Sequence, residues 1–91
     1  MPINPDNLEL FDQAILRVLQ SNNTRFGLSP QAIGFFCRSY GFNPEQTQTT
    51  DRLEYLAGKN LALEVPKVIG QSIRAWKITD AGRLYLDEHN L

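Results

Sequence analysis

This chain has the length and composition of one small globular domain. Its 91 residues suffice for a single modest hydrophobic core, and the apolar fraction of 42% is ordinary for a folded protein. The formal net charge is −1, whereas domains that bind nucleic acid are usually basic. No apolar run is long enough to span a membrane, and residues 1–6 lack the basic and apolar regions of a signal peptide. The single cysteine, Cys37, cannot form an internal disulfide, so we expect a reducing, cytoplasmic setting.

The first helix is predicted over residues 6–20, after an arm at residues 1–5. Asp6 is expected to cap it, with Glu9 completing a capping box. Helical spacing places these apolar residues on one face: Leu8, Phe11, Ile15, Val18 and Leu19. Leu10 points away from that stripe, so it either lies beneath a neighbouring segment or belongs to a subunit contact.

Two further helices are predicted at residues 30–40 and 44–58, joined by a very short turn. Ser29 is expected to cap the first helix, and Gly41 to end it in the left-handed conformation. Asn43 then caps the second at once. The apolar residues of the first helix are Ile33, Phe36, Cys37 and Tyr40. A three-residue turn with glycine between two helices is typical of the helix-turn-helix motif. An extended connector, with one possible edge strand, precedes the pair at residues 25–28.

The helix at residues 44–58 is polar in its first half and apolar in its second. Every residue at 45–51 is polar, whereas Leu53 and Leu56 offer apolar anchors on the same face as Thr49. We therefore expect this helix to pack through its second half and to present its first half to a partner.

After residue 60 the apolar period changes from that of a helix to that of a strand. A β-hairpin is predicted over residues 61–79, with its turn at residues 70–71. Leu61, Leu63 and Val65 alternate along the first strand. Trp76 and Ile78 share one face of the second strand and are core candidates.

A last helix is predicted at residues 80–89, with Thr79 as its cap. Its expected shared face consists of Ala81, Leu84, Tyr85 and Glu88. Leu86 lies off that face. Gly82 would allow the helix to approach the strand closely.

Two runs of sequence resemble segments of one known family. Residues 51–65, D-R-L-E-Y-L-A-G-K-N-L-A-L-E-V, resemble the end of a recognition helix leading into a wing strand. Residues 76–86, W-K-I-T-D-A-G-R-L-Y-L, resemble the end of the wing and the start of the next helix. Both are similar to winged helix-turn-helix regulators of the MarR and PadR kind, except that Asn60 stands where glycine is usual. The resemblance covers residues 7–89 and implies one α+β domain with a three-helix core, a C-terminal hairpin wing and a final helix.

The resemblance also implies a function, namely a transcriptional regulator that binds double-stranded DNA. Its third helix would enter the major groove and its wing would lie on the phosphate backbone. The residues expected to contact DNA are Gln46, Thr47, Gln48, Thr50, Arg52, Tyr55, Lys67, Arg74 and Lys77. The first four can meet base edges, and the others suit the backbone. Regulators of this type commonly pair through their first and last helices, and the candidates for a homodimer contact are Leu10, Leu86 and Leu91.

The charge distribution keeps a second function open. Glu45 and Asp51 accompany a single cation, Arg52, on the presenting helix, which favours a winged-helix module that binds a protein partner without DNA. The cationic hairpin and the glutamine- and threonine-rich tract favour DNA.

An enzyme is not expected. The sequence has no glycine-rich phosphate loop, no HExxH, no serine elbow and no metal-ligand spacing, so we predict neither a cofactor nor a metal. Cys37 lies among aromatic residues, as an inert core thiol does, and His89 stands two residues from the end of the chain.

Overall fold

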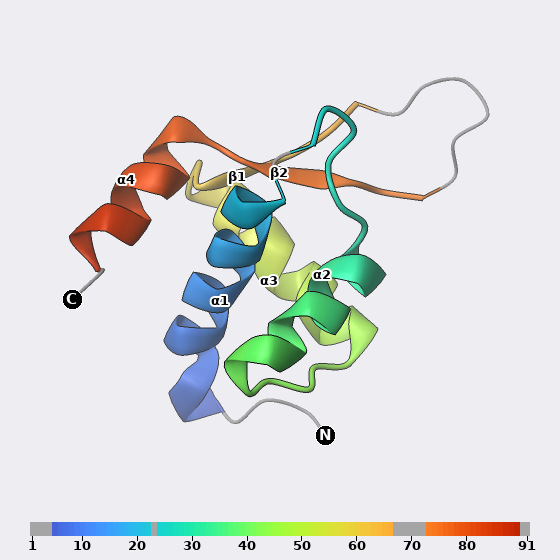
Figure 1. Ribbon diagram of the computed structural model, residues 1–91, viewed down its shortest axis with the longest axis vertical. Coiled ribbons are helices and arrows are strands. Elements are labelled where there is room, and N and C mark those ends of the chain that lie inside the picture. Colours follow the sequence, from blue (N-terminus) through green and yellow to red (C-terminus); the bar gives the residue numbers. More distant parts are fainter. Residues whose placement is uncertain (1–4, 23, 67–72, 90–91) are drawn as a thin grey trace.

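The computed structural model describes residues 5–22, 24–66 and 73–89. These residues form an α+β fold with four α-helices and one two-stranded antiparallel sheet (Figure 1). The helices are α1 (Leu8–Ser21), α2 (Pro30–Cys37), α3 (Gln46–Gly58) and α4 (Asp80–Glu88), and the strands are β1 (Ala62–Glu64) and β2 (Trp76–Ile78). Short 3-10 turns, η1 (Pro5–Asn7) and η2 (Arg38–Tyr40), precede α1 and follow α2.

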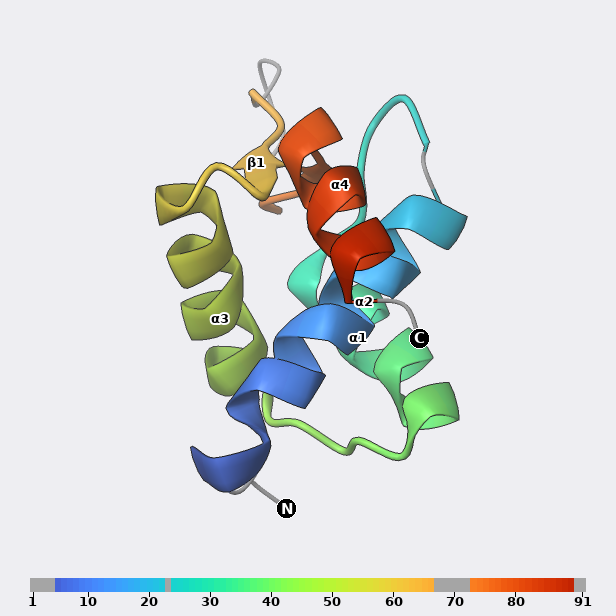
Figure 2. The ribbon, with the colours of Figure 1, turned by 90° about the vertical axis from the view of Figure 1, so that its left-hand side faces the viewer.

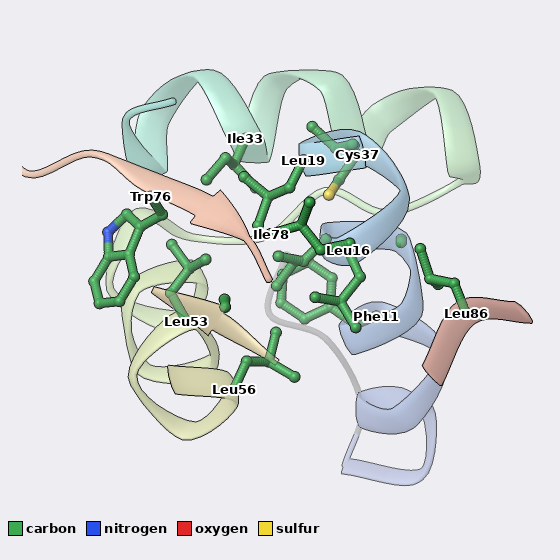
Figure 3. Packing of buried hydrophobic residues seen from close by; sticks show 14 residues of the cluster. Phe11, Leu16, Leu19, Ile33, Cys37, Leu53, Leu56, Trp76, Ile78 and Leu86 are labelled. Atoms are coloured by element: carbon green, nitrogen blue, oxygen red, sulfur yellow. The ribbon is translucent and has the colours of Figure 1, made fainter. Parts of the chain in front are cut away.

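Helix α1 lies at the centre, where it packs against α2, α3, α4 and β2 (Figure 2). Its buried residues are Phe11, Asp12, Ala14, Ile15, Leu16, Val18 and Leu19. Figure 3 shows Phe11, Leu16 and Leu19 of α1 in one cluster with apolar side chains of the other helices and the strands, including Ile33 of α2, Leu53 of α3 and Trp76 of β2. One core therefore holds all the elements together.

The sheet is short, and β2 is paired along both of its edges. Strand β1 pairs with β2 in the register Ala62↔Ile78, Leu63↔Lys77 and Glu64↔Trp76. On the other side of β2, Leu28 and Trp76 exchange two backbone hydrogen bonds of 2.9 and 2.8 Å, which confirms an edge pairing in the connector at residues 25–28. Trp76 and Ile78 are buried as predicted. The hairpin turn predicted at residues 70–71 lies outside the described residues.

Several predicted helix ends are confirmed. The Ala32 amide donates to the Ser29 hydroxyl at the start of α2, and Gly41 ends the η2 turn at a φ of +88°. The Gly82 amide donates to the Thr79 hydroxyl at the start of α4. Asn60 adopts a left-handed φ of +62°.

Two helices begin later than predicted. Helix α1 starts at Leu8 with Asn7 as its N-cap, so Asp6 does not cap it. Helix α3 starts at Gln46, and the connection after η2 is five residues long (41–45) rather than three. Phe42 packs its ring 5.5 Å from that of Phe11, and the backbone is still extended at Glu45, whose ψ is 154°.

Helix α2 buries less of its stripe than expected. Ile33 and Cys37 are fully buried, whereas Phe36 and Tyr40 are 38% and 46% exposed. The 3-10 turn that follows Cys37 tightens the helix, so Tyr40 no longer lies directly above Phe36.

The face of α4 was predicted wrongly. Leu84 is 59% exposed, whereas Leu86 is buried in the core, so Leu86 cannot serve the subunit contact predicted for it. The cause is Gly82, because a Cβ built there would stand 2.1 Å from the Leu61 carbonyl oxygen. This close approach fixes the rotation of α4 and turns Leu86, one helical turn on, toward α1.

We predict that Gly82→Ala lowers the free energy of unfolding by roughly 1 to 3 kcal/mol, because the added methyl group must push α4 off the backbone of residue 61. Gly58→Ala is the matched control, since a Cβ there meets nothing within 4 Å. Urea denaturation measures both variants. Equal stabilities for the two alanine variants would contradict the close approach.

Candidate functional site

Helix α3 packs through one face and presents another. Leu53 and Leu56 are buried as predicted, and Gln46 and Thr47 at its amino end are exposed. Thr49 is fully buried, although it belongs to the half that was predicted to face a partner, because it lies one turn before Leu53 on the packed face. The other two predicted base-contact residues, Gln48 and Thr50, are half-buried. The amino end of α3 therefore offers part of the predicted polar surface to a partner.

The start of α3 leaves backbone donors on the surface. Glu45 is its N-cap residue but makes no side-chain capping bond, and the first helical bond runs from the Thr49 amide to the Glu45 carbonyl over 3.0 Å. The backbone amides of Gln46 and Thr47 come before the Thr49 amide in the helix. Like the first amides of any α-helix, they have no carbonyl partner within the helix. The Thr50 hydroxyl donates back to the Gln46 carbonyl over 3.1 Å, so its proton is engaged within the helix.

Arg52 faces inward rather than toward a partner. Its Nε donates to Asp12 Oδ1 over 2.8 Å, and its Nη2 donates to Asp12 Oδ2, which ties α3 to α1. The Asp12 and Arg52 side chains are only 7% and 19% exposed. The hydrogen bonds that Arg52 donates to Asp12 raise the pKa of Arg52. The guanidinium also lies 4.1 Å above the ring of Tyr55, which is itself 44% exposed. Arg52 was predicted to contact the DNA backbone, and it instead forms this two-bond ion pair with Asp12.

Arg74 joins the hairpin to α3. Its Nε donates to Glu64 Oε2 over 2.7 Å, and its Nη1 donates to Glu54 Oε1 over 2.8 Å. Donation to Glu64, and to a lesser extent to Glu54, raises the pKa of Arg74. The guanidinium stands 4.9 Å from the ring of Trp76. These carboxylates are partly exposed, so the pair lies on the surface where solvent screens it.

The remaining predicted contacts fall in different places. Lys77 is half-buried opposite Leu63, on the side of the hairpin away from Trp76. Leu10 is 55% exposed and is available to a partner. Lys67 and Leu91 lie outside the described residues.

Two cations near α3 were missed in the sequence. Arg38 lines a groove of about 200 Å³ together with Gln46 and Thr49, and Lys59 lies 5.2 Å from the ring of Tyr55. The predicted pairing of α2 with α3 could have placed Arg38 near the amino end of α3, because the end of one helix must pass near the start of the next. The exposed side of α3 also carries two acids, Asp51 and Glu54.

Cys37 and His89 are the single cysteine and the single histidine of the sequence. The described residues contain no group of three or more histidine, cysteine, aspartate or glutamate side chains that could hold a metal ion. Burial raises the pKa of the Cys37 thiol to about 12, so this sulfur is protonated and poorly nucleophilic at neutral pH. His89 is exposed and accompanies Tyr85, whose ring centroid lies 4.2 Å away.

No protein-family model matches this chain, and no curated protein matches it either. Among the described residues, none of the helices has the length and apolar character needed to cross a membrane.

We predict that Asp12→Asn lowers the free energy of unfolding by about 2 to 3 kcal/mol, because it leaves a half-buried guanidinium without its anion. Arg83→Gln, which removes an exposed ion pair with Asp80 at 3.3 Å, is the control and should leave stability unchanged. Thermal and urea unfolding measure both. An Asp12→Asn variant as stable as the parent would show that the ion pair between Asp12 and Arg52 does not stabilise the packing of α3 on α1.

The Cys37 thiol should resist alkylation by iodoacetamide in the folded chain at pH 8 and react as the chain unfolds in urea. Its pKa is raised to about 12 from an ordinary 9.0, so its contribution to stability is complete below pH 9 and is lost as the pH rises toward 12. Mass spectrometry of labelling against urea concentration tests this. Rapid native labelling would contradict the burial.

Proposed function

We propose that this chain is a winged helix-turn-helix domain that binds double-stranded DNA and regulates transcription. The observation that carries the proposal is the amino end of α3, where Gln46 and Thr47 are exposed while Leu53 and Leu56 dock the rest of the helix. The hairpin lies beside the same helix, linked through Arg74 and Glu54. A helix held by its second half beside a hairpin is the arrangement that winged-helix domains place on DNA.

We expect some residues of this surface to contact base edges and others to contact the phosphate backbone. The amides of Gln46 and Gln48 can pair with adenine in the major groove, and Thr47 can offer a hydroxyl to a base or phosphate. Backbone donors at the start of α3 favour a nearby phosphate. Arg38 would meet the phosphate backbone beside the start of α3, and Lys77 would meet it from the hairpin.

The engaged arginines limit the expected affinity. Arg52 is held by Asp12, and Arg74 must exchange Glu54 or Glu64 for a phosphate before it neutralises one. Because each neutralised phosphate adds to affinity through counterion release, few free cations mean weak binding by one copy. We therefore infer that tight binding requires two copies, and we place such a regulator in the cytoplasm.

A second function is favoured by the same ion pairs. With both arginines paired and Asp51 and Glu54 exposed on α3, the presented face suits a partner that carries cations. A protein with a basic, polar surface would be complementary to these carboxylates. The winged-helix fold would then act as a protein-interaction module.

The two functions are separated by a fluorescence-anisotropy titration of mixed-sequence duplex DNA at two salt concentrations. For DNA binding we expect affinity to fall steeply with salt, and Lys77→Gln to reduce the slope of log K against log salt by about 1. Arg83→Gln on α4 makes the same charge change away from α3 and serves as the control. Absence of binding at low salt would reject the DNA proposal.

Removing acids gives the opposite test. Glu54→Gln deletes a carboxylate from the presented face and frees one nitrogen of Arg74, so it should strengthen DNA binding several-fold. Asp87→Asn removes an exposed acid from α4 and should change affinity far less. If both variants gain equally, the α3 face is not the one that meets DNA.

A further inference from the structure

A pocket of about 240 Å³ opens where α1, α3 and α4 meet. Leu56 and Leu61 form its apolar wall, and Tyr55 of α3 and Tyr85 of α4 line it as well. Leu56 is buried in the core and Leu61 packs against that core, so the apolar wall is firmly held. Because a water takes up ~30 Å³ of the liquid, the pocket has room for a molecule of about eight or nine non-hydrogen atoms.

The pocket carries charges of both signs. Asp12 and Arg52 stand in its wall, but they neutralise each other in their ion pair. Glu9 of α1 and Lys59, the residue that follows α3, line the pocket and are exposed. Neither forms an ion pair with any residue that the structure describes. One carboxylate and one ammonium group are therefore left for a ligand.

These two charges stand beside different tyrosines. The Lys59 ammonium lies 5.2 Å from the centre of the Tyr55 ring, and this contact leaves its N–H donors able to bind an anion. Burial, and then the nearby charge of Glu9, raises the pKa of Tyr85, so Glu9 lies close to that tyrosine. A molecule in the pocket thus meets a cation on the α3 side and an anion where α1 meets α4.

We propose that this pocket binds a free α-amino acid whose aliphatic side chain is about the size of that of leucine. The ammonium group of the amino acid binds Glu9, and its carboxylate binds Lys59. Its side chain packs on Leu56 and Leu61, where removal from water is favourable.

The two charges select a zwitterion. A carboxylic acid without an amine would bring a second negative charge beside Glu9, and an amine without a carboxylate would bring a second positive charge beside Lys59. A wholly apolar molecule would use neither group. This site does not require DNA binding, so it stands or falls separately from the proposed function.

A titration of the full chain with L-leucine, followed by the amide signals in NMR spectra, tests the proposal. We expect saturable shifts at Glu9, Tyr55 and Tyr85, with weak affinity because solvent screens both charges. Isocaproate lacks the ammonium group and isoamylamine lacks the carboxylate, and each should bind about three- to fivefold more weakly. No saturable shift near the solubility limit of leucine, or equal binding of either analogue, overturns the proposal.

Removing one charge at a time tests which end of the ligand each residue binds. Lys59→Gln should weaken the binding of leucine and isocaproate but not that of isoamylamine. Glu9→Gln should weaken the binding of leucine and isoamylamine but not that of isocaproate.

Two variants outside the pocket serve as matched controls. Lys77→Gln on β2 and Asp87→Asn on α4 remove the same charges, and both should bind leucine as the parent chain does. The same spectra show whether each variant is folded. If the folded Glu9 and Lys59 variants bind leucine as tightly as the controls do, the proposal is rejected.

Discussion

The burial of α1 is the constraint on which the rest of this structure depends. Seven of its residues are buried, and every other helix and β2 pack against it. Because four neighbours share one helix, only a narrow strip of α1 reaches the surface. Even the buried carboxylate of Asp12 serves this arrangement, since its guanidinium partner comes from α3. The position of α3 is therefore fixed twice, by apolar contact and by an ion pair.

The arginines act within the fold more than on its surface. Arg52 spans from α3 to α1, and Arg74 spans from the hairpin to α3. Together they hold the two parts of the proposed DNA surface in a set relation to the core. The same contacts consume cations that a DNA surface would otherwise offer. Specificity for a partner would then come from the exposed start of α3 rather than from charge.

The sequence predicted most of the elements because their signals are local. The caps at Ser29 and Thr79, the left-handed Gly41 and the alternation around Trp76 all act within a few residues. The contacts that it did not predict join distant segments. Asp12 and Arg52 are 40 residues apart, and no local pattern pairs them. The rotation of α4 escaped prediction for the same reason, because it depends on how close Gly82 comes to Leu61.

The connection between η2 and α3 illustrates a conflict between local signals. Asn43 and Pro44 form a good helix start, yet the chain stays extended through Glu45, whose ψ is 154°. Phe42 must reach the core beside Phe11, and this tertiary contact outweighs the earlier cap. The presented end of α3 is shortened as a result, so Gln46 becomes its first residue.

Amide hydrogen exchange along α3 tests the central claim most directly, namely that this helix is anchored by its second half and presents its first turn. The account predicts rapid exchange at Gln46 and Thr47, and slow exchange close to the global unfolding limit at Leu53 and Leu56. Uniform strong protection from the first turn onward would contradict it, as would rapid exchange at the two leucines.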